Sequence, residues 1–316
     1  MLRYSIQRII FMIPVALVVS FVAFMLIHLI PGDPARVLLG EEATPQNVAA
    51  LQKQLGLDKP LLVQFVLWLW QALHGNLGQS IQLQQPVTYA LMQRLPVTIE
   101  LGVASLLFSL VLALFLGVYS ATHRSSWVEW LVNISSLIGT AIPSFVLALI
   151  LIFLFAVVWR FFPPGGYTPL MDDPVANLRD LILPMVALGT GAVAVNLRQI
   201  RASMTEVLEQ DYVRTARAKG LDERRVNYVH ALRNALIPLI TIVGLQIGAI
   251  LGGAFVIETI FLWPGIGALA IQSIFSKDYP VVQGIVLLVA FSYMLTNLLV
   301  DLSYAFFDPR IRLGKS

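Results

Sequence analysis

The sequence of 316 residues contains no cysteine, which excludes disulfide frameworks, thiolate metal sites and cysteine nucleophiles. Charged residues are also scarce, at 12% of the chain, whereas soluble domains contain roughly 25%. Hydrophobic residues account for 58%, and the mean hydropathy is +0.79. This composition excludes an ordinary soluble enzyme and predicts a protein that resides in a membrane.

Six apolar stretches are long enough to cross a bilayer, whose hydrocarbon core of about 30 Å requires roughly 20 helical residues. They cover residues 9–30, 97–121, 131–158, 181–197, 236–261 and 281–306. Arg3 and Arg8 precede the first stretch, as in a secretory signal, but its 22 residues exceed a signal core and no small-residue cleavage site follows. We therefore expect an all-α, polytopic membrane protein with six transmembrane helices, the first of them an anchor.

Lysine and arginine are distributed unevenly between the loops that connect these stretches. With the N-terminus inside, the inner segments hold 14 of the 21 Lys and Arg residues, although they comprise 65 residues against 107 outside. Positive residues favour the cytoplasmic side of a membrane, so we expect both termini in the cytoplasm. The same asymmetry explains the pI of about 9.2, and we expect contact with membrane lipid and none with nucleic acid.

This orientation divides the chain into an N-terminal transmembrane helix (1–30), an extracytoplasmic loop or cap (31–96), a five-helix transmembrane domain (97–306) and a cytoplasmic tail (307–316). The cap contains an apolar stretch at 61–73. Its 13 residues are too few to span a bilayer and indicate an interfacial or packed helix.

The inner loop 198–235 has the pattern of two helices bent at a glycine. The first, over 205–219, ends before Gly220, a residue suited to the left-handed conformation that stops helices. Asp222 is placed to cap a second helix that continues toward the fifth span. Charge alone is consistent with a solvated basic loop. The mixed signs of its charges and the helix signals favour a surface for a protein partner. Movement of that partner could then shift the two spans that the loop connects.

Several motifs carry a family resemblance. They are DYVRTARAKGL at 211–221, HALRNALIP at 230–238, LGLDKPL at 55–61, VIETIF at 256–261, WPGIG at 263–267, DYP at 278–280, NLLVD at 297–301 and DPR at 308–310. With them the chain resembles the inner-membrane permeases of the dipeptide, oligopeptide, nickel and glutathione branch of ABC importers. The early PGDP at 31–34 and the long outer loop resemble the B-type subunit of that branch.

The resemblance implies a type I ABC importer permease fold in a bacterial inner membrane. The chain would form half of the translocation path for a peptide-like solute and would work by alternating access. Its implied partners are a C-type permease, one or two ABC ATPases and an extracytoplasmic solute-binding protein. The chain itself would be no enzyme and hold no cofactor, because the ATPase binds ATP and Mg. The sequence does not determine whether the cargo is a dipeptide, oligopeptide, glutathione, nickel complex or sugar.

The resemblance also implies an ATPase-docking loop. Its candidate residues are Tyr212, Arg214, Ala216, Lys219, Gly220, Leu221 and Asp222. Arg214 stands where the wider importer superfamily has a glutamate, so a glutamate-based contact is not carried over to it. An ATP-independent carrier or channel, or a structural anchor, would leave this loop unexplained.

Three carboxylates, those of Glu100, Glu258 and Asp301, lie within or near the ends of predicted spans. Intramembrane carboxylates are costly and are usually functional or paired. Two interpretations stay open for them: a structural role, such as capping a helix, and lining of a path or gate. The four histidines, His28, His74, His123 and His230, have no metal-ligand spacing, and we expect no metal site.

Overall fold

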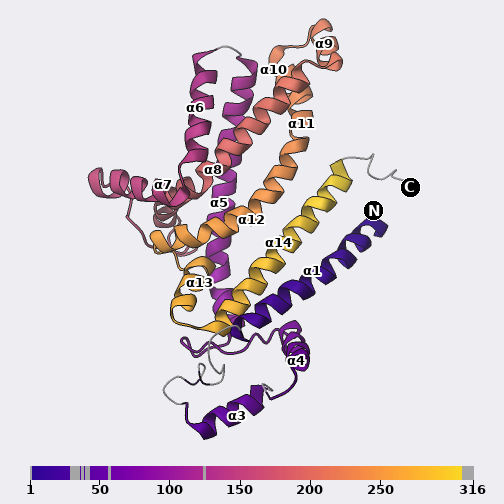
Figure 1. Cartoon of the computed structure of the whole chain (residues 1–316). Coiled ribbons are helices and arrows are strands. Elements are labelled where there is room, and N and C mark those ends of the chain that lie inside the picture. Colours follow the sequence, from indigo (N-terminus) through magenta and orange to yellow (C-terminus); the bar gives the residue numbers. More distant parts are fainter. Residues whose placement is uncertain are drawn as a thin grey trace. The chain divides into compact units, whose positions relative to one another are not determined.

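The computed structural model describes residues 2–28, 36, 39, 43–55, 58–123 and 126–307. Within these residues the regular elements are helices, with one isolated antiparallel bridge between Gln79 and Pro86 (Figure 1). In chain order they are α1 (Leu2–His28), α3 (Pro45–Leu55), α4 (Leu61–Leu73), α5 (Val87–Thr122), α6 (Trp127–Ala141), α7 (Ser144–Leu151), the π-helix η2 (Ile152–Val158), α8 (Pro174–Leu208), α9 (Asp211–Ala218), α10 (Glu223–Arg225), the π-helix η3 (Val226–Ala231), α11 (Leu232–Ala235), α12 (Ile237–Ile260), α13 (Ile266–Phe275) and α14 (Tyr279–Phe307).

Four of the described helices, α1, α5, α8 and α14, are long and apolar enough to cross a membrane without a break. Two bent helix pairs raise the number to six if each pair counts as one span. The prediction of an all-α membrane fold is confirmed, and the six predicted spans equal the upper of these two values.

The apolar stretch 131–158 is not one helix, contrary to the sequence-based prediction. Helix α6 ends at Ala141, and the helix that begins at Ser144 is bent from it by 104° (Figure 1). Pro143 causes the break, since its ring disfavours the helical conformation of the preceding residue, and Ile142 accordingly lies at φ −83° and ψ 118°. The third predicted span is therefore a broken one.

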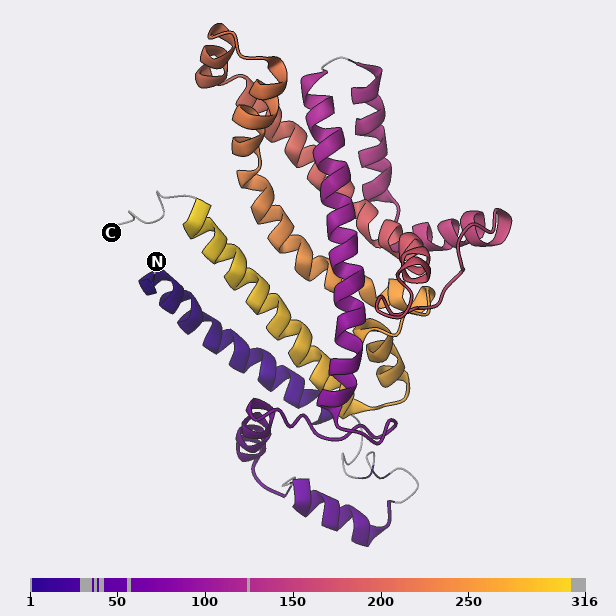
Figure 2. The ribbon, with the colours of Figure 1, turned by 180° about the vertical axis from the view of Figure 1, so that it is seen from behind.

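The chain forms two compact units, one comprising Met1–Pro96 with Leu269–Leu295 and the other Val97–Ala268 with Thr296–Ser316. In the first, α1 and α14 lie side by side (Figures 1 and 2). The side-chain amide of Gln283 donates to the carbonyls of Ala23 and Phe24 at 3.1 and 3.2 Å. The Phe24 ring also contacts two aromatic rings of α4 in tilted arrangements, and α4 is the helix predicted at 61–73.

The second unit is a bundle in which α6, α7 and α12 pack against α8 (Figure 2). One core cluster includes Leu101, Ala187 and Ile257, and a second includes Ile200 and Met204. Helix α8 extends beyond the predicted span 181–197 to Leu208, so the predicted inner loop begins inside this helix.

Candidate functional site

Residues 209–236, which we call the connecting segment, join α8 to α12 and contain every candidate docking residue. The predicted helix over 205–219 is wrong as a single element, because α8 ends at Leu208 and Gln210 is extended, with ψ 149°. The break lets α9 fold back, so that Val213 is buried in a small cluster with Val207 and Leu208. Burial of this apolar side chain stabilises the fold through tertiary contacts, which helix propensity alone does not predict.

The helix stop at Gly220 is confirmed. Its φ is +78°, in the left-handed region. The Gly220 N–H donates to the Arg217 carbonyl at 2.9 Å, and the Leu221 N–H donates to the Ala216 carbonyl at 3.4 Å. These two bonds form a Schellman motif, which satisfies carbonyls that the end of α9 leaves without helical partners.

The second helix signal is also confirmed, since the Asp222 carboxylate accepts the Arg224 N–H at 3.2 Å and caps α10. A charged hydrogen bond crosses the bend, where the Arg217 Nε donates to Glu223 at 2.8 Å. The Asn234 amide donates to the Tyr212 hydroxyl at 2.8 Å and joins α11 to α9. These two hydrogen bonds therefore connect the part of the segment that precedes Gly220 to the part that follows it.

The side chains of the connecting segment divide into an inner and an outer set. Ala216 and Leu221 belong to the cluster around Val213 and Val226, where they contribute packing. The outer set consists of exposed residues and includes Asp211, Tyr212, Arg214, Lys219, Asp222, Glu223, Arg224 and Arg225. The 3.5 Å pair of Arg214 and Asp211 has side chains that are 71% and 97% exposed, and such pairs contribute little to stability. The exposed charges outside the Arg217–Glu223 pair are thus accessible to a partner.

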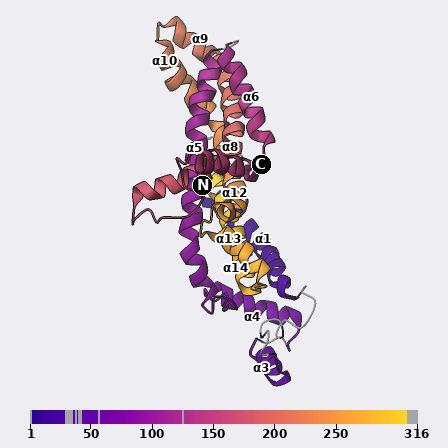
Figure 3. The same ribbon diagram turned by 90° about the vertical axis from the view of Figure 1, so that its left-hand side faces the viewer.

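The connecting segment is joined to the bundle by apolar packing. Ala231 and Ala235 pack in the cluster that also contains Ile200 and Met204 of α8. Figures 2 and 3 show α9 and α10 at the same end of this unit as the C-terminal end of α5 and the start of α6. A pocket of about 330 Å³ lies there, lined by Ala121, Thr122, Leu208, Glu209, Arg217, Glu223 and Asn227. A displacement of the segment therefore acts on the ends of α5 and α8.

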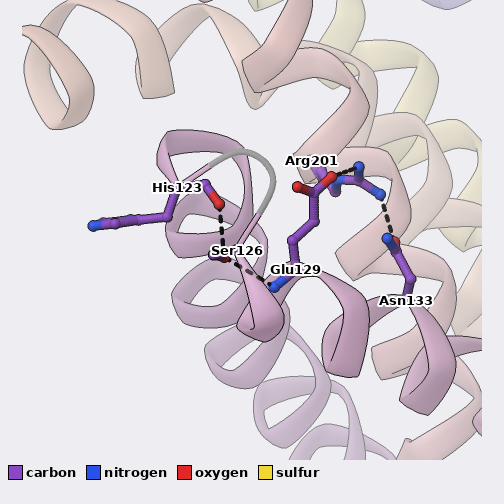
Figure 4. Close-up of polar contacts among 5 residues, drawn as sticks. All are labelled: His123, Ser126, Glu129, Asn133 and Arg201. Atoms are coloured by element: carbon purple, nitrogen blue, oxygen red, sulfur yellow. Dashed lines mark hydrogen bonds and ion pairs between the residues drawn. The ribbon is translucent and has the colours of Figure 1, made fainter.

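A polar cluster links α8 to α6 (Figure 4). Arg201 of α8 forms an ion pair with Glu129 and a hydrogen bond with Asn133, which lie one turn apart on α6. The Ser126 hydroxyl accepts the Glu129 N–H at 3.2 Å and so caps α6. The Arg201 and Glu129 side chains are 31% and 17% exposed, so water screens this pair less than a fully exposed one. Sequence reasoning missed it. The available signal was a Glu and an Asn at i and i+4 on one helix face.

Glu258 is 0% exposed and holds the start of α13. Its carboxylate accepts the Thr98 hydroxyl at 2.6 Å and the N–H groups of Gly267 and Ala268 at 2.7 and 3.0 Å. Thr98 in turn accepts the Ile266 N–H at 2.8 Å. A carboxylate at a helix N-terminus is favourable because it satisfies free N–H groups and complements the helix dipole. This geometry is that of a structural cap joining α5, α12 and α13.

Glu100 accepts hydrogen bonds from the Tyr167 hydroxyl at 2.8 Å and from the Asn177 amide at 2.6 Å. Burial raises the pKa of Tyr167 to about 12, and the hydrogen bond to Glu100 and its charge act in the same direction. The phenol therefore stays protonated as a donor at physiological pH.

Asp301 lies in α14, but its side chain is outside the described part of the structure. The path or gate role of the three carboxylates stays a prediction.

Metal binding finds no support in the part of the chain that the structure describes. There, no group of three or more His, Asp or Glu side chains is arranged to hold a metal ion. His28 and His123 instead take part in local hydrogen bonds, to Gln64 and within the end of α5.

Residues 113–313 match the family of binding-protein-dependent transport system inner membrane components, and residues 1–102 match the N-terminal region of such membrane components. The chain belongs to this family. The permease is 40% identical over 339 residues to the dipeptide transport system permease protein DppB of Escherichia coli K12, covering 100% of both chains. It is also 40% identical over 332 residues to DppB of Alkalihalophilus pseudofirmus, covering 99% of the permease and 100% of the relative. A crystal structure of an amino acid ABC transporter with histidines has 16% identity and a TM-score of 0.49, covering 71% and 94% of the two chains.

The family assignment confirms several predictions. The permease is a multi-pass inner-membrane component of an ABC importer, and it is a non-catalytic subunit whose ATPase is a separate chain. The transport system to which it belongs includes an ATPase and a binding protein as partners. The alternatives of an ATP-independent carrier and of a structural anchor are set aside.

Proposed function

We propose that the permease forms half of the translocation path for a peptide-like solute, of the dipeptide, oligopeptide or glutathione type. Support for the cargo class comes from full-length identity of 40% to two dipeptide permeases. In this proposal a C-type permease provides the other half of the path, and one or two ABC ATPases bind ATP and Mg, while this chain holds no cofactor. Both termini lie in the cytoplasm, as the distribution of Lys and Arg indicates.

The connecting segment is the surface on which the ATPase docks. The observation that carries this proposal is its division into a buried cluster and an exposed charged face. Tyr212, Arg214, Lys219 and Asp222 would contact the ATPase, whereas Ala216, Gly220 and Leu221 would hold the shape of the contact surface. A preformed surface loses little conformational entropy when a partner binds.

Coupling follows from the way the segment is attached. Closure of the ATPase dimer on binding ATP moves the segment, and the apolar packing of Ala231 and Ala235 passes this motion to α8. The Arg201–Glu129 pair makes α6 follow α8. The spans then reorient from inward-facing to outward-facing, and ATP hydrolysis resets them. This sequence of events is alternating access, in which the connecting segment moves as a rigid element and carries the spans with it.

Gly220→Val tests the coupling role. A Cβ at Gly220 would meet nothing within 4 Å, but φ is +78°, a conformation that costs residues with a side chain about 1–2 kcal/mol and β-branched ones most. We expect ATP-driven uptake of a labelled dipeptide into vesicles to fall at least tenfold, with the protein still present in the membrane. Gly220→Asn is the matched control, because Asn tolerates this conformation, and it should retain most uptake. Normal uptake by Gly220→Val would show that the coupling assignment is wrong.

The partners can be tested separately. A mild-detergent pull-down of the tagged permease should recover a second six-span permease and one or two ATPases. If the folded permease is recovered alone after cross-linking, the docking assignment is wrong.

A further inference from the structure

A layer of polar side chains interrupts the apolar core of the second unit. On α5 the buried positions recur every fourth residue, from Leu101 through Ser105 and Ser109 to Ala113, and all four are 0% exposed. Leu101 belongs to the first core cluster and Ala113 to the second. The two serines therefore lie about one turn apart on one buried face, between the two clusters.

Two other helices add an amide each to this layer. Asn196 of α8 is 0% exposed and lies between Leu188 of the first cluster and Ile200 of the second. Gln246 of α12 lies about one turn before Ile250 of the first cluster. We call the four side chains the polar layer, namely Ser105, Ser109, Asn196 and Gln246. Polar groups buried between apolar clusters are costly unless they form hydrogen bonds.

Asn196 joins the three helices of the polar layer. Its amide nitrogen donates to the Gln246 side-chain oxygen at 3.0 Å and to the Ser109 hydroxyl at 3.3 Å. The Ser109 hydroxyl in turn donates to the Leu106 carbonyl at 2.8 Å. Helices in a membrane associate partly through such side-chain hydrogen bonds. Asn196 therefore fixes α8 and α12 at one position along α5.

Three buried atoms of the polar layer have no hydrogen-bond partner among the residues that the structure describes. They are the Asn196 Oδ1, the Gln246 Nε2 and the Ser105 hydroxyl oxygen. Atoms like these are rarely left unsatisfied in a folded protein, because each one costs free energy. A hydroxyl can donate and an amide oxygen accepts. The layer thus holds the donor, on Ser105, and the acceptor, on Asn196, of a hydrogen bond that this arrangement does not make.

The contact between α5 and α8 beside the polar layer involves glycines. A Cβ at Gly189 would lie 2.9 Å from the Ser105 carbonyl, and one at Gly117 would lie 3.3 Å from the Leu197 carbonyl. Small residues allow two helix backbones to approach this closely. At these two points the glycines present no side chain that would block sliding of one helix along the other.

We propose that Asn196 is a positioning residue with two alternative partners on α5, Ser109 in one state of the transport cycle and Ser105 in the other. The connecting segment is continuous with α8 and α12 but not with α5, so its movement shifts these two helices along α5. A shift of one helical turn, roughly 5.4 Å, brings Asn196 from one serine to the other. Shifts of this size separate the two states of some packed helices.

The exchange leaves the bond between Asn196 and Gln246 in place, while Ser105 donates to the Asn196 Oδ1. Because each state has one serine as a partner for Asn196, the two states have similar free energies, and movement of the connecting segment can select either. The inference rests on the proposed function, in which the spans reorient between two states.

Ser105→Ala tests this, because the hydroxyl has no partner in the described arrangement and its removal leaves that arrangement intact. We expect ATP-driven uptake of a labelled dipeptide by the complete transporter in vesicles to fall about tenfold. The midpoint temperature of unfolding should be unchanged or higher, since an unsatisfied buried group is removed. Ser120→Ala is the matched control. Ser120 is also on α5, 0% exposed and without a partner among the described residues, but it lies outside the polar layer, so uptake should not change.

Either of two results in Ser105→Ala would overturn the proposal. Normal uptake would show that the second state does not use this hydroxyl. Reduced uptake together with a lower unfolding midpoint would show that Ser105 stabilises the fold as a whole and not one state of the cycle.

A distance measurement needs no cargo. The chain contains no native cysteine, so spin labels can be placed at Leu107→Cys on α5 and Leu245→Cys on α12, both of which are exposed. The complete transporter, otherwise free of cysteine, is measured in nanodiscs by double electron–electron resonance, with and without ATP and vanadate. We expect ATP and vanadate to populate a second distance, and Ser105→Ala to reduce that population about tenfold.

The outcomes separate this inference from the proposed function. A second distance that is equally populated in Ser105→Ala and in the unsubstituted layer would overturn the inference and leave alternating access standing. A distance that ATP and vanadate do not change in the unsubstituted layer would overturn both.

Discussion

Glu258 and Arg214 are both charged side chains of the same compact unit, yet they are used in opposite ways. The Glu258 carboxylate is 0% exposed and accepts three hydrogen bonds from residues of its own chain. The Arg214 side chain is 71% exposed, and its ion pair with Asp211 is long, at 3.5 Å. A buried carboxylate with these partners holds helices together, because leaving it or its donors unsatisfied is costly. An exposed guanidinium contributes almost nothing to the fold and is free to serve a partner.

The Arg201–Glu129 pair lies between these two extremes. It is half-buried and joins two helices, but it is not enclosed as Glu258 is. From Glu258 through the Arg201–Glu129 pair to Arg214, we therefore expect substitutions to affect stability less and coupling or assembly more.

Glu258→Ala should have the largest effect on stability. It removes three hydrogen bonds and leaves the Thr98 hydroxyl and the first N–H groups of α13 without their acceptor, so we expect a loss of about 3–5 kcal/mol in the free energy of unfolding. Thermal unfolding of the detergent-solubilised protein, followed by tryptophan fluorescence, measures it. Glu206→Ala, at an exposed site of α8, should change stability by less than about 0.5 kcal/mol. Lost transport at unchanged stability would instead favour the path or gate interpretation of Glu258.

Reversal of the Arg201–Glu129 pair should affect stability moderately and coupling strongly. Arg201→Glu places like charges together between α8 and α6, and we expect a loss of about 1–2 kcal/mol with less solute transported per ATP hydrolysed. The double reversal Arg201→Glu with Glu129→Arg restores opposite charges and should recover transport. Uptake and ATPase rates of the four proteins form a double-mutant cycle. Additive effects, without recovery in the double variant, would contradict a direct coupling role for the pair.

Arg214→Ala should have the smallest effect on stability, within about 0.5 kcal/mol, because its pair with Asp211 is solvated. It should nevertheless reduce the ATPase recovered with the permease in mild detergent by about tenfold at moderate salt. Lys53→Ala removes another exposed cation, on α3, and serves as the control. Equal ATPase recovery from all three proteins would argue against docking through the outer face of the connecting segment.

Local signals in the sequence predicted part of the site correctly. Gly220 and Asp222 act on their immediate neighbours through backbone conformation and capping, so their roles can be inferred from a few adjacent residues. The same holds for α4, whose composition and length indicate a short helix. The break at Gln210 was missed because it depends on where Val213 is buried, and no local pattern specifies that.

The sequence by itself determined that the protein is a helical membrane protein, which residues form most of its spans, and where its glycine stop and helix cap lie. These properties follow from apolar length, charge distribution and backbone preference, all of which act over short distances along the chain. Only the tertiary structure decided that Arg201 pairs with Glu129, that Glu258 caps α13, and that Asp278 accepts a hydrogen bond from the Ser80 hydroxyl. Those contacts join residues 72, 9 and 198 positions apart. Their partners are chosen by packing, and an isolated charge in a sequence does not reveal which donor folding will bring to it.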